Sequence, residues 1–226
     1  MNIVVSGASK GIGFELALQL AKLGHRVLAI ARSEDRLAML KEQSKLIEVL
    51  AIDLMDRALS SEIAKKVPGW KQVDVVINNA GQLINMPFIQ STLEDFEQQY
   101  KGNVLTSINL IQACHPYYRK GTHIVNITSM GGVQGSSKFP GLSAYSASKG
   151  ALVVLSECLA AEYKELGVLI NALALGAVQT EMLDEAFPGY EAPLTAKEMA
   201  KYIAEFACNG GNYYNGQVLP VALGNP

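Results

Sequence analysis

The sequence predicts one doubly wound α/β domain, in which helices cover both faces of a parallel sheet. Short runs rich in β-branched residues alternate with longer stretches whose apolar residues recur at helical spacing. Strands separated by helices are joined by right-handed crossovers and therefore run parallel. No linker-like tract of Pro, Gly and Ser and no internal repeat divides the 226 residues, so a single domain spanning 1–226 is the simplest architecture.

The strands follow from runs that are apolar almost throughout, as in a sheet covered on both faces. The first run leads directly into a glycine-rich turn, after which residues 14–23 have helical spacing, and a further helix begins near Thr195. In chain order the predicted strands are Asn2–Ser6, Arg26–Ala31, Leu46–Ile52, Val73–Asn78, Thr122–Thr128, Val168–Leu175 and Gly216–Val221. A ligand is expected outside the carboxyl ends of these strands.

Composition excludes several classes of protein. With 49% hydrophobic and 18% charged residues, the chain is not of the disordered type. A formal net charge of −2 with Lys and Arg spread thinly provides no basic patch for nucleic acid or an anionic membrane. Met1-Asn2 leads straight into an apolar run without a basic segment, and the longest charge-free apolar stretch, Leu166–Thr180, is shorter than the roughly 20 residues of a membrane span. We therefore expect a cytoplasmic protein.

Cysteine and histidine residues are scattered and lack metal-ligand spacing. Neither Cys-x-x-Cys nor His-x-x-x-His occurs, so no protein-bound metal is predicted. The cysteines are odd in number, and each lies in an apolar helical pattern, which predicts reduced thiols in the core. They are Cys114, Cys158 and Cys208.

The turn after the first strand, Ser6–Gly13, has the features of a phosphate cradle. Gly7 permits a tight turn, Gly11 allows the backbone to approach a pyrophosphate, and Gly13 lets the following helix pack against the strand. The spacing is Gly-x-x-x-Gly-x-Gly, not Gly-x-Gly-x-x-Gly. A glycine-rich turn can also be a purely structural corner, but the strand before it and the helix after it favour a dinucleotide site.

Tyr145 and Lys149 are spaced to act together. Side chains at i and i+4 share one face of a helix, so the Lys ammonium is expected to lower the pKa of the Tyr phenol. A phenol with a lowered pKa exchanges protons near neutral pH. On its own, Tyr-x-x-x-Lys is also common on solvated helix faces.

Several motifs in a fixed order carry a resemblance that covers essentially the whole chain. They are Ser6–Gly13, Asp53, Asn78-Asn79-Ala80-Gly81, Asn103, Ser129, and Tyr145 with Lys149. In these the sequence resembles the short-chain dehydrogenase/reductase family. The resemblance implies a Rossmann-type sheet of seven parallel strands in the order 3-2-1-4-5-6-7, a nicotinamide cofactor, and interconversion of a carbonyl and a secondary alcohol.

By this resemblance four residues form the catalytic group. Tyr145 is the general acid in reduction and the general base in oxidation, and Ser129 hydrogen-bonds the reacting oxygen. Lys149 lowers the pKa of Tyr145 and holds the nicotinamide ribose hydroxyls, while Asn103 anchors a water that relays protons. Two alternatives stay open: Ser129 as an ordinary strand-end serine, and Asn103 as a residue that merely bends its helix.

The resemblance also implies the cofactor contacts. The carboxylate of Asp53 approaches the adenine amino group, although an Asp here can equally be a helix-entry residue, and Thr180 bonds the carboxamide. Asn78-Asn79-Ala80-Gly81 lines the site and stabilises the sheet. The full predicted set is Gly7, Ser9, Lys10, Gly11, Ile12, Gly13, Arg32, Ser33, Asp53, Leu54, Asn79, Ala80, Gly81, Tyr145, Lys149, Gly176, Val178 and Thr180.

The end of the second strand favours NADP(H) over NAD(H). An acidic residue there would accept from the ribose 2′-hydroxyl of NAD, but the chain has Arg32 and Ser33 instead. Arg32 can make a bidentate contact with a 2′-phosphate, Ser33 can donate a hydrogen bond to it, and Lys10 adds a second cation. The alternative is a solvated Arg32 before a helix capped by Ser33, with nearby Glu34 and Asp35 weakening the positive field.

Two of the segments near the site depart from the family pattern, and a third is predicted to cover the substrate. Leu175-Gly176 stands where Pro-Gly is usual, and the glycine-rich stretch 131–143 is expected to be an exposed loop beside the substrate. Residues 178–193 are predicted to form a substrate lid. The lid is largely apolar, which favours an apolar or aromatic carbonyl substrate, through Met182, Leu183, Phe187 and Tyr190.

Two functions from different classes follow. The first is an NADP(H)-dependent short-chain oxidoreductase acting on a small carbonyl or alcohol. The second is a catalytically weak dinucleotide-binding sensor or scaffold with the same fold. The presence of Ser129, Tyr145 and Lys149 favours the enzyme. The resemblance also implies a homodimer or homotetramer that pairs through the helices holding Asn103 and Tyr145.

Overall fold

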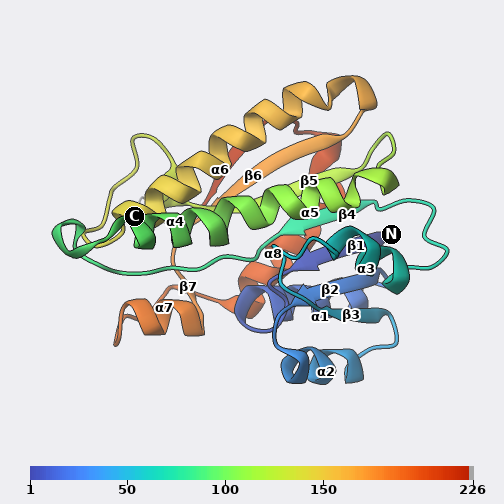
Figure 1. The fold of residues 1–226 in the computed structure, drawn as a ribbon, viewed down its shortest axis with the longest axis horizontal. Coiled ribbons are helices and arrows are strands. Elements are labelled where there is room, and N and C mark those ends of the chain that lie inside the picture. The colour runs from blue at the N-terminus through green and yellow to red at the C-terminus, as the bar shows by residue number, and fades with distance from the viewer. Residues whose placement is uncertain (224–226) are drawn as a thin grey trace.

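The computed structural model describes residues 1–223 (Figure 1). Its main sheet has the strand order β3-β2-β1-β4-β5-β6-β9, and all its pairs are parallel. The predicted sheet and its order are confirmed, and the predicted strand bounds hold to within two residues. The strands are β1 Asn2–Ser6, β2 Arg26–Ala31, β3 Ile47–Ala51, β4 Val75–Asn78, β5 His123–Ser129, β6 Leu169–Leu175 and β9 Val218–Val221. The last three residues of the predicted domain, 224–226, lie outside the described residues.

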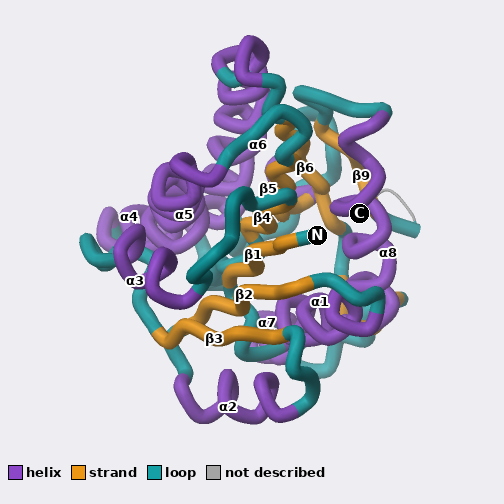
Figure 2. Tube along the Cα trace, turned by 90° about the vertical axis from the view of Figure 1, so that its right-hand side faces the viewer, coloured by secondary structure: helices purple, strands orange, loops and turns teal. Residues whose placement is uncertain are grey.

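Helices cover both faces of this sheet (Figure 2). On one face α1 and α8 pack with α2 against β1 and β2, and on the other α3, α5 and α6 pack against the opposite side of the same strands and their neighbours. Successive side chains of β1 point to opposite faces of the sheet, so Ile3 and Val5 pack in the hydrophobic cluster on one face and Val4 packs in the cluster on the other. The helices are α1 Gly11–Lys22, α2 Glu34–Glu42, α3 Leu59–Lys66, α4 Leu93–Tyr100, α5 Thr106–Cys114, α6 Ser143–Glu162, α7 Glu181–Ala186 and α8 Ala196–Asn209.

Local sequence sets where the site-bearing helices begin and bend. Thr195 caps α8 by accepting from the backbone N–H of Glu198, and the Glu198 carboxylate accepts from the Thr195 N–H. The helix therefore starts at Ala196, close to the predicted Thr195. A π-helical turn, Lys101–Leu105, joins α4 to α5. Such turns are rare and often occur at functional sites. This one carries Asn103.

The predicted lid contains regular structure that the sequence did not suggest. Within it lie β7 (Val178–Gln179) and α7, and β7 pairs with β8 (Leu194–Thr195) in a separate two-stranded sheet. α7 lies beyond the carboxyl ends of the main strands (Figure 1). This places the segment across the point where the strand order reverses between β1 and β4, the usual position of a ligand in an open parallel sheet.

The cysteine prediction is only partly correct. Cys114 is buried, but Cys208 is partly exposed and Cys158 is exposed on α6. An apolar pattern on a helix does not distinguish residues that face the sheet from those beside that face. Among the described residues, no helix is long and apolar enough to cross a membrane.

Candidate active site

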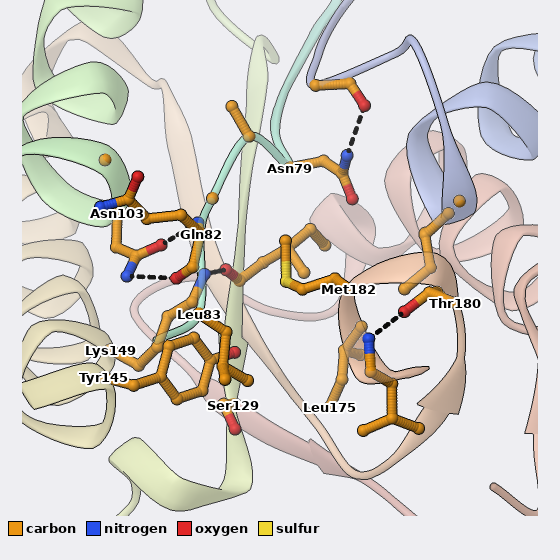
Figure 3. A pocket seen from close by; sticks show the side chains of 18 of the residues that line it. Asn79, Gln82, Leu83, Asn103, Ser129, Tyr145, Lys149, Leu175, Thr180 and Met182 are labelled. Carbon is orange, nitrogen blue, oxygen red and sulfur yellow. Dashed lines mark hydrogen bonds between the residues drawn. The ribbon is translucent and has the colours of Figure 1, made fainter. Parts of the chain in front are cut away.

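A cavity of about 710 Å³ lies at the carboxyl ends of the strands, and almost every predicted site residue lines it. It runs from the glycine-rich turn to the lid, and Ser129, Tyr145 and Lys149 lie together on one side of it (Figure 3). Only Gly13 and Ser33 of the predicted set do not line it. Gly13 lies beneath the turn, and Ser33 is the residue before α2.

The turn between β1 and α1 leaves room for a ligand because its glycines have no side chains. Gly7 and Gly11 have φ values of +67° and +55°, which favour glycine. A Cβ on Gly13 would lie 2.2 Å from the Gly7 carbonyl oxygen, so strand and helix approach as closely as the sequence predicts. Asn79 fixes the turn from β4 by donating to the Ser6 and Gly7 carbonyl oxygens at 3.1 and 3.3 Å. The turn thus fits the pyrophosphate of a dinucleotide.

Tyr145 lies in the first turn of α6 and faces Ser129 at the end of β5. Burial raises the pKa of Tyr145 to about 12, and a hydrogen bond with Ser129 offsets part of this effect. The prediction of a lowered Tyr145 pKa is therefore wrong. Helical spacing predicts which residues are neighbours, but it does not predict how much water they lose on folding.

Lys149 is buried one helical turn after Tyr145. Its Nζ donates to the Ile127 carbonyl oxygen at 2.9 Å and lies 5.9 Å from the centroid of the Tyr145 ring. Burial lowers the pKa of Lys149 to about 8. Gly81 makes space for this side chain, since a Cβ there would lie 3.3 Å from Nζ.

Asn103 holds the chain that follows Gly81. Its Nδ2 donates to the Gln82 carbonyl oxygen at 3.0 Å and to Ser148 Oγ at 2.9 Å, and its Oδ1 accepts from the Gln82 N–H at 2.9 Å (Figure 3). Gln99, fully buried one turn earlier, lies 3.1 Å from the same Nδ2. Asn103 therefore connects the cavity wall to α6, the helix of Tyr145 and Lys149.

The opposite end of the cavity contains charged groups. Arg32 is exposed at the cavity edge. Lys10 Nζ lies 3.3 Å from Glu181 and 3.5 Å from Glu185, both on α7. Asp53 also lines the cavity, and its carboxylate accepts from the Met55 N–H at 2.8 Å, as in an ordinary turn.

The substrate end of the cavity is apolar. All four lid residues named in the sequence analysis line this end of the cavity. Phe139, from the predicted exposed loop, and Leu83 line it as well. Two charged lining residues lie near them, Lys149 and Glu181, which precedes Met182 on α7. The four lid residues are Met182, Leu183, Phe187 and Tyr190.

Sequence reasoning missed several lining residues. Gln82 and Glu181 each adjoin a predicted residue, so inspection of the neighbours of Gly81 and Thr180 could have found them. Gln99, which does not line the cavity, was also missed, although its i−4 spacing from Asn103 was visible. Most of the other lining residues outside the predicted set also adjoin a predicted residue: Ala31, Ile52, Met55, Gly102, Thr128, Met130, Leu175 and Ala177. Gly131 and Leu142 belong to the loop 131–143 that is predicted beside the substrate. The remaining residues come from elements that converge only after folding: Gln98, Lys101, Thr106 and Ile127.

Comparisons with known proteins agree with this architecture. Residues 1–191 match the family described as short chain dehydrogenase. The NADPH-dependent pterin aldehyde reductase of Arabidopsis thaliana is 34% identical over 205 residues, which cover 85% of this chain and 82% of that protein. The fatty acyl-CoA reductase of Acinetobacter baylyi is 31% identical over 80% of this chain, but the match spans only 63% of that protein. The solved structure of ElxO with NADP bound has a TM-score of 0.85 at 26% identity, covering 97% of this chain and 96% of that one. The chain therefore belongs to the short-chain dehydrogenase family.

Proposed function

We propose that the protein is an NADP(H)-dependent oxidoreductase that interconverts a carbonyl compound and the corresponding alcohol, a secondary alcohol from a ketone or a primary alcohol from an aldehyde. The observation that carries the proposal is the convergence of Ser129, Tyr145 and Lys149 on one wall of a cavity whose far end is a glycine turn. A protein that only binds a dinucleotide needs the turn but not the three polar side chains. The sensor or scaffold alternative leaves them without a role.

The proton chemistry follows from the environment of Tyr145. With a pKa near 12 the phenol keeps its proton at neutral pH, so in reduction its Oη can donate to the carbonyl oxygen. Ser129 donates a second hydrogen bond to the same oxygen, where negative charge develops. A bound nicotinamide supplies or accepts the hydride. In oxidation Tyr145 takes the proton back.

Lys149 and Asn103 support this step in different ways. The Lys149 ammonium stabilises the tyrosinate that remains after proton donation and would hold the ribose hydroxyls of the cofactor. Asn103 positions Gln82 and Ser148, and by family resemblance it anchors a water that returns the proton to Tyr145.

Cofactor choice rests on the cations beside the glycine turn. Arg32 at the end of β2 can make a bidentate contact with a 2′-phosphate, and Lys10 provides a point charge. Ser33 can add a hydroxyl after a rotation toward the cavity. The NADPH-dependent Arabidopsis relative and the NADP complex of ElxO support this choice.

The substrate is proposed to be an aldehyde or ketone with an apolar or aromatic substituent. The apolar side chains of the segment 178–193, acting as a lid, would cover that substituent and leave the carbonyl at Tyr145. Lys149, the cation near them, is assigned to Tyr145 and the cofactor ribose, so it is not offered to a phosphate or carboxylate on the substrate. We also propose a cytoplasmic homodimer or homotetramer, with neither nucleic acid nor membrane as a partner.

The test follows oxidation of NADPH and NADH at 340 nm with hexanal, benzaldehyde, an apolar ketone, a sugar and a phosphorylated aldehyde. Apolar carbonyls should be reduced and NADPH preferred, while Tyr145→Phe should lose at least about 100-fold in kcat yet still bind NADPH. Undiminished turnover by Tyr145→Phe would remove Tyr145 from its role. NADPH binding without reduction of any apolar carbonyl would favour the sensor.

A further inference from the structure

A carboxylate on the lid forms an ion pair with Lys10, one of the cations proposed to bind the 2′-phosphate of the cofactor. Glu181, the first residue of α7, lines the cavity and lies 3.3 Å from Lys10 Nζ. Its Oε2 also accepts from Arg36 Nη1 at 2.9 Å, so it bridges the glycine turn and α2. Glu185, one turn further along α7, lies 3.5 Å from the same Lys10 Nζ. Two carboxylates thus compete for one ammonium.

We infer that Glu181 is a specificity-determining residue that weakens binding of 2′-phosphorylated cofactor by holding Lys10. The inference rests on the proposed function, in which Lys10 and Arg32 receive the 2′-phosphate. A 2′-phosphate placed on Lys10 meets the negative charge of Glu181 unless the carboxylate moves away. The uncharged 2′-hydroxyl of NAD(H) meets no such repulsion.

The size of the effect follows from exposure and charge. The side chains of Lys10 and Glu181 are 38% and 51% exposed, so each ion pair is screened by water and contributes little to stability. A competing 2′-phosphate carries close to two charges, which increases both its attraction to Lys10 and its repulsion from Glu181. The hydrogen bond from Arg36, followed by that from Lys10, keeps the pKa of the Glu181 carboxyl below its usual range, so it is ionised at neutral pH.

Removing this charge should change cofactor selection without touching the reacting groups. In Glu181→Gln, Lys10 loses its nearest carboxylate while Ser129, Tyr145 and Lys149 are unchanged. Arg36 is also released from its partner and adds positive charge near Arg32. Glu191→Gln is a matched control, because Glu191 is an exposed residue of the same segment with no ion pair among the described residues.

The experiment measures binding of 2′,5′-ADP and 5′-AMP to the full chain by titration calorimetry. These probes differ only in the 2′-phosphate and need no catalysis. Glu181→Gln should bind 2′,5′-ADP about threefold to tenfold more tightly than the parent, with 5′-AMP changed by less than about twofold. The gain should disappear in the Lys10→Ala background, and Glu191→Gln should behave like the parent.

The outcomes separate this inference from the proposed function. If the parent binds both probes equally but Glu181→Gln gains a preference for 2′,5′-ADP, the proposed NADP(H) preference fails and the role of Glu181 stands. If Glu181→Gln binds both probes as the parent does, or changes no more than Glu191→Gln, the inference is overturned. A gain that persists without Lys10 also overturns it.

Discussion

The Lys149 ammonium lies 5.9 Å from the centre of the Tyr145 ring, held there by the Ile127 carbonyl oxygen. Burial changes both groups in the direction that removes charge, raising the pKa of Tyr145 to about 12 and lowering that of Lys149 to about 8. Below about pH 8 the pair is therefore a neutral phenol beside a cation. That state can donate a proton and stabilise the anion that remains.

This relationship predicts the pH dependence of reduction. Lys149 is charged below its pKa of about 8 and neutral above it, so stabilisation of the tyrosinate is lost as pH rises through 8. We expect kcat/KM for the cofactor, which reports the ligand-free enzyme, to fall above about pH 8. Lys149→Arg keeps its charge, so its residual activity should not show this fall. A parent profile that is flat to pH 10 would contradict the assignment.

Ser129 should contribute mainly to the transition state. Ser129→Ala removes the hydroxyl that faces Tyr145 and is proposed to donate to the carbonyl oxygen. We expect kcat to fall about 100-fold, as when one donor to a developing oxyanion is lost, with the NADPH dissociation constant unchanged. Steady-state rates and fluorescence titration of NADPH measure the two effects. Ser143→Ala, at the exposed start of α6, serves as the control and should leave both unchanged. A weaker affinity with normal kcat would mean that Ser129 only binds.

Asn103 should affect both stability and rate. Asn103→Ala leaves the partly buried N–H and C=O of Gln82 without their side-chain partner, which costs about 1–3 kcal/mol in the free energy of unfolding. Because Gln82 lines the cavity beside Lys149, we also expect kcat to fall about 10-fold to 100-fold. Urea unfolding and initial rates test this. Gln112→Ala, on the exposed face of α5, should change stability by no more than about 0.5 kcal/mol. Equal stability of Asn103→Ala and the parent would show that Asn103 does not hold Gln82 in place.

The sequence predicted the sheet well because its strands are buried on both faces and therefore read as nearly continuous apolar runs. It predicted the glycine turn because Gly7 and Gly11 have backbone conformations that few other residues adopt. It did not predict α7 and its small sheet, since the lid has neither strong periodicity nor a buried face. The pKa of Tyr145 was predicted in the wrong direction, because desolvation depends on packing from several elements. The pairing of Lys10 with Glu181 joins residues 171 positions apart and has no local signal.

His123 should make folding stability depend on pH near 6. It is buried at the start of β5, with Nδ1 3.0 Å from the Ala207 carbonyl oxygen and Nε2 3.0 Å from Asn171 Nδ2. The carbonyl requires a proton on Nδ1, so Nε2 accepts from the Asn171 amide. Asn171 cannot reverse its amide without losing the bonds to Tyr214 and Gln217. A second ring proton would therefore face another donor.

The sign of the effect follows from the pKa. Burial lowers the pKa of His123 below 6.5, although the hydrogen bond to Ala207 opposes this. The unfolded chain thus takes up a proton first as pH falls, so stability is fully present above about pH 6.5 and is lost below it, by at most about 1.4 kcal/mol per pH unit for one proton. Urea unfolding between pH 8 and 5 measures this slope. His25 also has a lowered pKa, so the comparison is with His123→Gln, which should be less stable at pH 8 but have a shallower slope. Equal slopes in the two proteins would show that His123 keeps its proton affinity on folding.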